Sequence, residues 1–305
     1  MDWNTRLTYL EAHPNLMPVV LGPTACGKTH LAVQLAGRLN AEIIGADSRQ
    51  VYRGMDLGTG KDLAEYVYEG RPVPYHLIDV AEPGTEYNVF LYQQAFDRVY
   101  AGLRARGVRP LLCGGSGLYL QSAIGARRFA EVPENAALRA ELQGLTLAEL
   151  SRRLSLYGPL HNHTDTESEA RCVRAIEIAE YEAAHPDDFR RTPPEACLIG
   201  IEVAPDVLRR RIRLRLEERL EQGMVEEVAG LLRKGLQPEQ LTYYGLEYRY
   251  VTDYLQGRLG LDAMREQLYT AICQFAKRQR TWFRGMERKG WKIDWLSLEE
   301  AAGLG

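Results

Sequence analysis

The stretch LGPTACGKTH, residues 21–30, holds the most specific short pattern in this chain. It fits G-x-x-x-x-G-K-[ST], a glycine-rich loop whose backbone curls so that successive N–H groups point into one concavity. A helix that follows such a loop adds its unpaired N–H groups and the positive end of its dipole. Lys28 brings a positive charge to phosphate oxygens, and the Thr29 hydroxyl can bind Mg²⁺. The predicted diphosphate-binding residues of this loop are Gly22, Pro23, Thr24, Ala25, Cys26, Gly27, Lys28 and Thr29.

The sequence around this loop alternates between strand and helix patterns. Short apolar runs rich in β-branched residues predict strands, and apolar residues at helical spacing predict helices. The predicted strands are residues 17–22, 41–47, 109–115 and 197–203. The predicted helices are residues 29–40, 89–107 and 205–235, with further helices to about residue 285. This alternation predicts an α/β fold of the P-loop NTPase type, in which helices flank a parallel sheet.

One region departs from the alternation, because it shows helical patterns broken by polar loops and no convincing strand. We therefore predict an all-helical insertion domain, residues 126–194, within a core made of residues 1–125 and 195–305. His161, His163 and Asp165 lie in one of its polar loops. Histidines in such loops are usually surface residues, so we predict no metal site there.

The composition narrows the function classes only slightly. A formal net charge of −3 argues mildly against a nucleic-acid partner, but the runs RRRIRLR (209–215) and KRQRTWFRGMERKGWK (277–292) could each form a local basic face. No apolar run approaches the roughly 20 residues of a membrane span. The five cysteines are scattered, and the N-terminal stretch lacks a secretory pattern. We expect a cytoplasmic protein that does not span a membrane.

Two further polar residues follow predicted strands, at the sheet edge where open α/β folds bind ligands. Asp47 ends the second strand, where a carboxylate facing the loop could accept a proton or support a metal. Its spacing is equally consistent with a residue that caps the next turn. Ser116 follows the third strand, where its hydroxyl could donate to a developing oxyanion. Spacing alone slightly favours a plain strand-to-helix turn at this position.

Taken together, the motifs resemble those of the tRNA dimethylallyltransferase family. The motifs that carry the resemblance, in the family's order, are GPTACGKT, ADSRQVYRGMDLGTGK, YHLIDV, GGSGLYL, RCVRAIEI, RRRIRLRLEERLEQGMVEEVAGLL and QFAKRQRTWFR. The resemblance covers about residues 19–295. It implies an enzyme that binds dimethylallyl diphosphate and the tRNA anticodon stem-loop, with Mg²⁺ as cofactor, and we expect a monomer. The dimethylallyl group would be transferred to N6 of the adenosine beside the anticodon, and pyrophosphate would be released.

The resemblance also implies catalytic roles. Asp47 would be the general base that draws the proton from N6, and Ser116 would contact the bridging oxygen of the diphosphate. Lys28 and a Mg²⁺ ion on Thr29 would neutralise the charge that grows on the leaving group. Arg211 and Arg215, four residues apart, would share one helical face and clamp the diphosphate. Without the resemblance, a solvated and salt-bridged helix would be the preferred interpretation of this arginine run.

On the RNA side, the resemblance implies a flipped adenine and a platform for the anticodon stem. The implied tRNA-binding residues are Asp47, Ser48, Arg49, Gln50, Ser116, Arg139, Arg171, Arg174, Tyr248 and Arg249. The first four would line the channel for the flipped base. The basic and aromatic residues of QFAKRQRTWFR suit RNA contact, but the aromatic residues at helical spacing are at least as consistent with a core.

Several residues depart from the family's common pattern. Cys26 replaces a serine or alanine, and Ser116 replaces a threonine but keeps the hydroxyl. Glu247 stands where a glycine is usual before Tyr-Arg, which puts a negative charge near the expected RNA. Ala170 replaces a glutamine before the insertion-domain arginines. These departures bear on tRNA recognition more than on the diphosphate chemistry.

Three alternative functions remain consistent with parts of the sequence. An adenylate isopentenyltransferase would share the chemistry but would act on free AMP, ADP or ATP. A P-loop small-molecule kinase would bind ATP, but it would leave the DSRQVYRGM run (47–55) without a role. A non-enzymatic, nucleotide-dependent RNA-binding protein would not need the carboxylate of Asp47 as a base.

Overall fold

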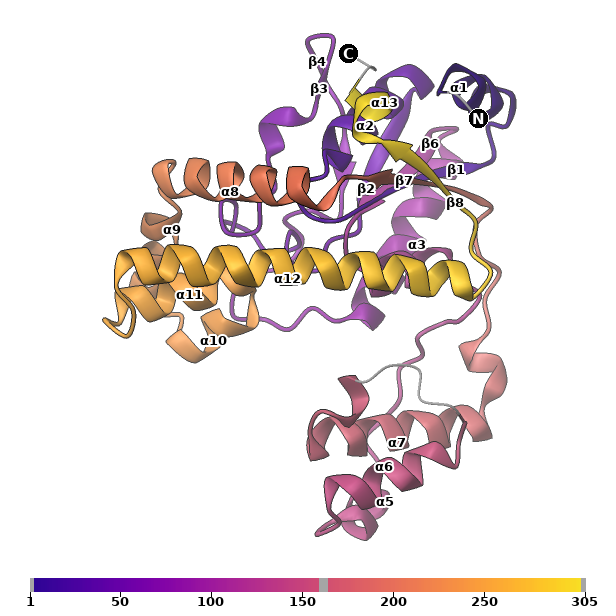
Figure 1. Cartoon of the computed structure of the whole chain (residues 1–305). Helices are drawn as coiled ribbons and strands as arrows, with labels where there is room; N and C mark the ends of the chain where they lie inside the picture. The colour runs from indigo at the N-terminus through magenta and orange to yellow at the C-terminus, as the bar shows by residue number, and fades with distance from the viewer. Residues whose placement is uncertain (1–2, 159–163, 303–305) are drawn as a thin grey trace. The chain divides into compact units, whose positions relative to one another are not determined.

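The computed structural model describes residues 3–158 and 164–302 of the chain (Figure 1). It divides into two compact units, of which unit 1 comprises Met1–Ile124 and Pro194–Gly305 and unit 2 comprises Gly125–Pro193. His161 and His163, considered above as metal ligands, lie outside the described residues. None of the described helices combines the length and the apolar composition that crossing a membrane requires.

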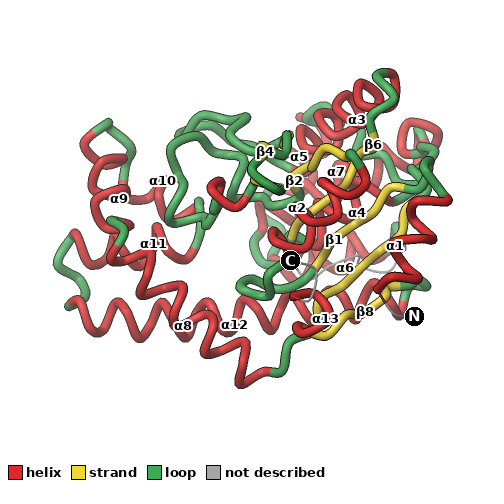
Figure 2. Tube along the Cα trace, turned by 90° about the horizontal axis from the view of Figure 1, so that it is seen from above, coloured by secondary structure: helices red, strands yellow, loops and turns green. Residues whose placement is uncertain are grey.

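Unit 1 is built on a six-stranded parallel sheet with the strand order β5-β2-β6-β1-β7-β8. Its strands are β1 (Met17–Leu21), β2 (Ala41–Gly45), β5 (Tyr75–His76), β6 (Arg109–Gly114), β7 (Ala196–Glu202) and β8 (Ile293–Ser297). The central strands β1 and β6 are buried along their whole length, as expected for a parallel sheet covered on both faces. Figure 2 shows the strands running side by side among the helices. The predicted fold class is confirmed.

Helices of unit 1 pack on this sheet and on one another. Those that contact strands include α2 (Lys28–Leu39), α3 (Val89–Ala105), α4 (Gly117–Ile124) and α13 (Leu298–Ala302). A second layer contains α8 (Pro205–Glu221), α9 (Met224–Arg233), α10 (Pro238–Tyr243), α11 (Leu246–Leu255) and the long α12 (Leu261–Arg288). Figure 1 shows α12 running alongside α8, with α9, α10 and α11 gathered near one end. α1 (Trp3–Ala12) precedes the first strand.

Three parts of unit 1 differ from the sequence prediction. The single helix predicted over residues 205–235 is wrong, because Gly223 adopts a left-handed φ of 101° and separates α8 from α9. Strands β5 and β8 were not predicted, since β5 has only two residues and β8 follows a long helix without a glycine-rich loop. A small antiparallel hairpin, β3 (Val67–Tyr68) with β4 (Arg71–Pro72), also escaped prediction.

Unit 2 is helical in its described regular elements, as predicted. Its helices are α5 (Ala136–Leu142), α6 (Leu147–Ser155) and α7 (Glu169–Ala184). α6 begins with a capping box, in which Thr146 and Glu149 satisfy each other's backbone N–H groups. A small separate core fills the space between the helices, formed by Leu138, Leu142, Leu150, Leu154, Cys172 and Ile176. Short 3-10 helices occupy Thr164–Thr166 and Pro186–Phe189.

Candidate active site

The glycine-rich loop connects β1 to α2, as the pattern predicted. Gly27 lies at the N-cap of α2 with a φ of 92°, a left-handed conformation that glycine adopts without steric cost. No described side chain caps this helix, so the amides of its first turn stay available to an anion. Cys26, within the loop, is fully buried, and burial raises the pKa of its thiol. A reactive thiolate at this position is therefore disfavoured.

The loop forms one wall of a cavity of about 1260 Å³ in unit 1. A cavity of this size has room for a diphosphate and a nucleobase together. The predicted site residues that line it are Thr24, Ala25, Gly27, Lys28, Thr29, Asp47, Ser48, Arg49, Gln50, Ser116, Arg211, Arg215 and Arg249. The structure thus brings together residues from five separated segments of the sequence.

Asp47 lies two residues beyond the end of β2 and lines the cavity with a half-buried side chain. Its Oδ1 accepts a hydrogen bond of 2.9 Å from the Arg49 N–H. The carboxylate therefore stabilises the turn after β2 and also lines the cavity, while its role as a base or metal ligand stays a prediction. The turn fixes the orientation of the carboxylate relative to the loop.

Ser116 links the turns that follow β6 and β2. Its Oγ accepts a hydrogen bond of 2.9 Å from the Ser48 N–H, and it lies 3.3 Å from Ser48 Oγ. Its own N–H donates to the Ala46 carbonyl at 3.2 Å. The hydroxyl is therefore held beside Asp47 at the carboxyl edge of the sheet, where it lines the cavity.

Two arginines of α8 contact the glycine-rich loop. Arg211 Nε donates to the Ala25 carbonyl at 2.7 Å. Arg215 Nη1 lies 3.4 Å from Thr24 Oγ1, and its Nη2 donates to the Gly60 carbonyl at 3.1 Å. Arg215 also forms an ion pair with Asp62. Both guanidinium groups are thereby oriented by protein oxygens at the edge of the cavity.

Comparison with known proteins places the chain in a family. A family model described as IPP transferase matches residues 50–286, and one described as Isopentenyl transferase matches residues 16–74. This chain belongs to the IPP transferase family.

Relatives in the family cover nearly the whole chain. It is 53% identical over 281 residues to tRNA dimethylallyltransferase 2 of Porphyromonas gingivalis, covering 92% of this chain and 93% of the relative. It is 53% identical over 278 residues to tRNA dimethylallyltransferase 2 of Bacteroides fragilis, with 91% of each chain covered.

Solved structures of the family share the architecture. The full-length tRNA isopentenylpyrophosphate transferase of Bacillus halodurans superposes with a TM-score of 0.68 and 31% identity, covering 93% of this chain and 90% of the other. A eukaryotic dimethylallyltransferase acting on tRNA has the same fold, with a TM-score of 0.76 at 21% identity, covering 93% of this chain and 74% of the other.

Sequence reasoning missed Gln279, a buried residue of α12. Its Oε1 accepts a hydrogen bond of 2.9 Å from the Thr24 N–H of the loop, and its Nε2 donates to the Gly115 carbonyl at 2.9 Å. One amide side chain thus joins the glycine-rich loop to the turn after β6. The only sequence signal was its helical spacing among apolar neighbours, which indicated burial but no partner.

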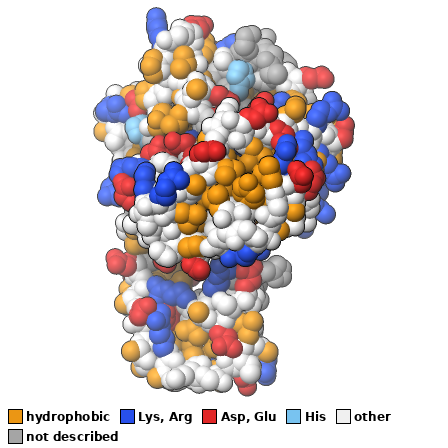
Figure 3. Space-filling model, turned by 90° about the vertical axis from the view of Figure 1, so that its left-hand side faces the viewer, with side chains coloured by type: hydrophobic (Ala, Val, Ile, Leu, Met, Phe, Trp, Pro, Cys, Tyr) orange, Lys and Arg blue, Asp and Glu red, His pale blue; other side chains and the backbone are white. Residues whose placement is uncertain are grey.

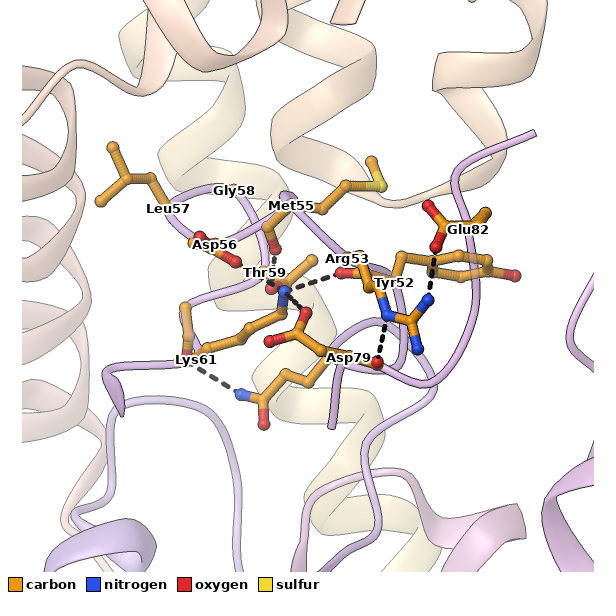
Figure 4. A network of polar contacts seen from close by, with 12 residues as sticks. Tyr52, Arg53, Met55, Asp56, Leu57, Gly58, Thr59, Lys61, Asp79 and Glu82 are labelled. Atoms are coloured by element: carbon orange, nitrogen blue, oxygen red, sulfur yellow. Dashed lines mark hydrogen bonds and ion pairs between the residues drawn. The ribbon is translucent and has the colours of Figure 1, made fainter. Parts of the chain in front are cut away.

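The loop of residues 56–61, which lines the cavity, was also not identified from the sequence. Lys61, completely buried, donates to the Tyr52 carbonyl at 2.7 Å and pairs with Asp56 at 2.6 Å and with Asp79 (Figure 4). Three partners surround its ammonium group, which compensates for the loss of water.

The opposite side of the same loop is held by Glu227 of α9. Its carboxylate accepts hydrogen bonds from the N–H groups of Asp56, Leu57 and Gly58 at 2.8, 2.8 and 3.0 Å. Successive amides that converge on one carboxylate form a protein-filled anion site. Together, Lys61 and Glu227 fix this wall of the cavity.

The prediction that Tyr248 contacts tRNA is not supported by its position. Its side chain is fully buried, and its hydroxyl donates to Glu227 at 2.7 Å. Tyr248 therefore belongs to the support of the loop at 56–61 and offers no surface to RNA. The neighbouring Arg249 lines the cavity, with its guanidinium 5.6 Å from the ring centre of Tyr250.

The three arginines predicted to bind tRNA in unit 2 have different environments. Arg139 Nε and Arg174 Nη1 donate to the buried carboxylate of Glu177 at 2.7 and 3.0 Å. Despite its burial, hydrogen bonds from Arg139, the Asn135 N–H and Arg174 lower the pKa of Glu177 to about 2. These two arginines have a structural role in unit 2. Arg171 differs, because the ion pair described for it is with Glu167, and both side chains are exposed.

The basic run at 209–215 does not form a uniform basic face. Arg213 Nη1 and Nη2 donate to Glu266 at 2.7 and 2.8 Å, and its guanidinium stacks 3.6 Å from the ring centre of Tyr269. Figure 3 shows basic and acidic side chains interspersed around apolar ones on one face of the molecule. The alternative of a salt-bridged helix therefore holds for Arg213, whereas Arg211 and Arg215 face the cavity.

Proposed function

We propose that this chain is a tRNA dimethylallyltransferase. It transfers a dimethylallyl group from dimethylallyl diphosphate to N6 of the adenosine on the 3′ side of the anticodon and releases pyrophosphate. The observation that carries the proposal is that Lys28 and Asp47 line one cavity, so that an anion-binding loop and a candidate base face the same space. Relatives that are about 53% identical and named tRNA dimethylallyltransferase support it.

Asp47 is the proposed general base. The lone pair of N6 attacks the allylic carbon, the carbon–oxygen bond breaks, and its electron pair goes to the bridging oxygen of pyrophosphate. The proton leaves N6 for the carboxylate of Asp47, which restores the neutral amine. Because the Arg49 N–H donates to one carboxylate oxygen of Asp47, the Asp47 side chain is oriented before the adenine enters the cavity.

The leaving group is stabilised by positive charge and by N–H donors. The proposed ligands of the diphosphate oxygens are the amides at the start of α2, the ammonium of Lys28, and the guanidinium groups of Arg211 and Arg215. Ser116 Oγ, held at the same edge of the sheet, would donate to the bridging oxygen. This arrangement concentrates the stabilisation where negative charge develops.

The residues present fit a Mg²⁺ ion that is held mainly by substrate. The Thr29 hydroxyl and the Asp47 carboxylate line the cavity, and both are oxygen donors, which Mg²⁺ prefers. In the described residues, no group of three His, Cys, Asp or Glu side chains forms a metal cluster. Mg²⁺ commonly keeps water and phosphate ligands beside one or two protein oxygens. When bound, the ion would add charge stabilisation to the diphosphate.

The tRNA contacts are proposed from exposure and position. Ser48, Arg49 and Gln50 line the cavity beside Asp47, where they can surround a flipped adenine. Arg49 lies 5.5 Å from the ring centre of Tyr243, an exposed aromatic residue that can stack on a base. Arg249 and the exposed Arg171 of unit 2 are the proposed phosphate contacts.

The proposal is tested by supplying radiolabelled dimethylallyl diphosphate with Mg²⁺ and one acceptor at a time. The acceptors are unmodified tRNA, AMP and, as a control, tRNA with guanosine in place of the target adenosine. Label in unmodified tRNA alone is the expected result. Label in AMP would favour an adenylate isopentenyltransferase. Phosphate transfer from ATP without prenyl transfer would favour a small-molecule kinase.

A further inference from the structure

Arg219 of α8 is a buried arginine that the reaction described above does not use. Its residue is only 7% exposed, and it lines the same cavity as Lys28 and Asp47. Among the described residues, no hydrogen-bond acceptor reaches its buried Nε or Nη2 atoms. A buried N–H group without a partner costs free energy, which a ligand oxygen would recover.

The position of Arg219 continues the row of arginines that contact the loop. Arg211, Arg215 and Arg219 are spaced four residues apart on α8, so their side chains follow one face of the helix. Arg211 and Arg215 have protein oxygens as partners, as described above. Arg219 differs because two of its three guanidinium nitrogens, Nε and Nη2, have no hydrogen-bond acceptor among the described residues.

The charge of Arg219 is balanced by Glu247, the residue that departs from the family's usual glycine. Arg219 Nη1 lies 3.7 Å from Glu247 Oε1, which is longer than a hydrogen bond. The guanidinium is therefore held by charge and packing, and it can turn toward the cavity without breaking a hydrogen bond to Glu247. Burial, followed by the charge of Arg215, lowers the pKa of Arg219 to about 10, so the group stays charged at neutral pH.

The loop opposite Arg219 is shaped to accept it. Gly60 has a φ of 62°, and a Cβ atom at this position would come within 1.6 Å of Arg219 Nη2. Glycine at position 60 therefore leaves room for the Arg219 guanidinium to pack against the loop. Its carbonyl accepts hydrogen bonds from Gln50 Nε2 and Arg215 Nη2, which ties the turn beside Arg219 to the walls of the site.

We propose that Arg219 is a further diphosphate-binding residue, which takes a phosphate oxygen of the prenyl donor or of the pyrophosphate product. Glu247 is its positioning residue, since it supplies the counter-charge while no anion is bound. The inference rests on the proposed function for the identity of the anion. It also gives Glu247 a role inside the cavity rather than at an RNA surface.

The test measures the affinity for inorganic pyrophosphate by titration calorimetry, with Mg²⁺ and without RNA. The double variant R219M/E247Q removes the guanidinium without leaving a buried lone carboxylate. We expect its dissociation constant to rise roughly tenfold or more. The matched control is Arg213→Met, on the same helix but paired with Glu266 away from the cavity, whose pyrophosphate affinity should equal that of the wild type.

A second variant covers a failure of the double variant to fold. Arg219→Lys keeps the charge beside Glu247 but loses the planar donors, so its pyrophosphate affinity should fall several-fold. If either folded variant binds pyrophosphate as tightly as the wild type, the inference about Arg219 is wrong, but the proposed function stands. The same holds if the variants lose only affinity for the anticodon stem-loop. If the wild-type protein binds no pyrophosphate, both this inference and the proposed diphosphate site are wrong.

Discussion

Gln279 Oε1 accepts a hydrogen bond of 2.9 Å from Thr24 N, which joins residues 255 positions apart in the sequence. The same side chain donates to Gly115, so α12 holds two turns of the candidate active site together. A buried amide that satisfies a backbone N–H and a backbone C=O is costly to remove, because both groups would lose their partners.

We expect Gln279→Leu to lower the free energy of unfolding by about 1–3 kcal/mol and to weaken pyrophosphate binding. Gln279→Glu keeps an acceptor for the Thr24 N–H but buries a carboxylate against the Gly115 carbonyl oxygen, so its loss of stability should be at least as large. Urea unfolding and calorimetry measure the two effects. Equal pyrophosphate affinity in Gln279→Leu and wild type would show that the loop does not depend on this bond.

Replacement of Asp47 separates its two roles. Asp47→Asn keeps an oxygen that can accept from the Arg49 N–H but removes the base, so kcat should fall roughly 10²-fold or more. Pyrophosphate affinity measured without Mg²⁺ should be nearly unchanged, because the turn and the loop remain. Steady-state prenylation of tRNA measures kcat. Turnover at the wild-type rate would refute the assignment of Asp47 as the base.

The buried ammonium of Lys61 predicts a large stability effect. Lys61→Met leaves the partly exposed Asp56 and Asp79 without their cation and should cost about 1.5–3 kcal/mol of unfolding free energy. Glu82→Gln is the matched control in the same network, because it breaks only the exposed pair with Arg53 (Figure 4). That control should change stability by no more than about 1 kcal/mol. Urea denaturation compares both variants, and similar losses would contradict the assignment.

The low pKa of Glu177 predicts a pH dependence for unit 2. Its folded pKa, about 2, lies below the ordinary value of 4.5, so the carboxylate stabilises the folded state fully above about pH 4.5. This contribution is lost as the pH falls from about 4.5 toward 2. Glu177→Gln should therefore be less stable than wild type at pH 7, and the difference should shrink toward pH 2. Amide NMR signals of unit 2, followed against pH and denaturant, measure the stability of both proteins. A stability difference that grows toward pH 2 would contradict the assignment.

The exposed Arg171 offers a test of tRNA binding that is separate from folding. Arg171→Ala should weaken anticodon stem-loop binding and reduce the slope of log affinity against log salt by about one. Its melting temperature should stay near that of wild type, since its pair with Glu167 is exposed. A salt slope identical to wild type would remove Arg171 from the proposed interface.

Local patterns in the sequence were enough to predict the loop at residues 22–29, the alternation of strands and helices, and the helical nature of the insertion. Each depends on residues close together in the chain, such as the glycines that allow left-handed backbone and the periodicity of buried side chains. Local patterns failed for the helix predicted over residues 205–235, because a single glycine in a polar stretch gave too weak a signal for a break.

Long-range partners could be found only in the folded chain. Gln279, Glu227 and the pair Arg219–Glu247 act on segments far away in sequence, and no spacing rule links them. Their partners follow from how α8, α9, α11 and α12 pack beside the carboxyl edge of the sheet. Residue types and short-range geometry thus specify which groups are candidates to bind a diphosphate. Packing between distant elements sets which partners hold those groups and which charges surround them.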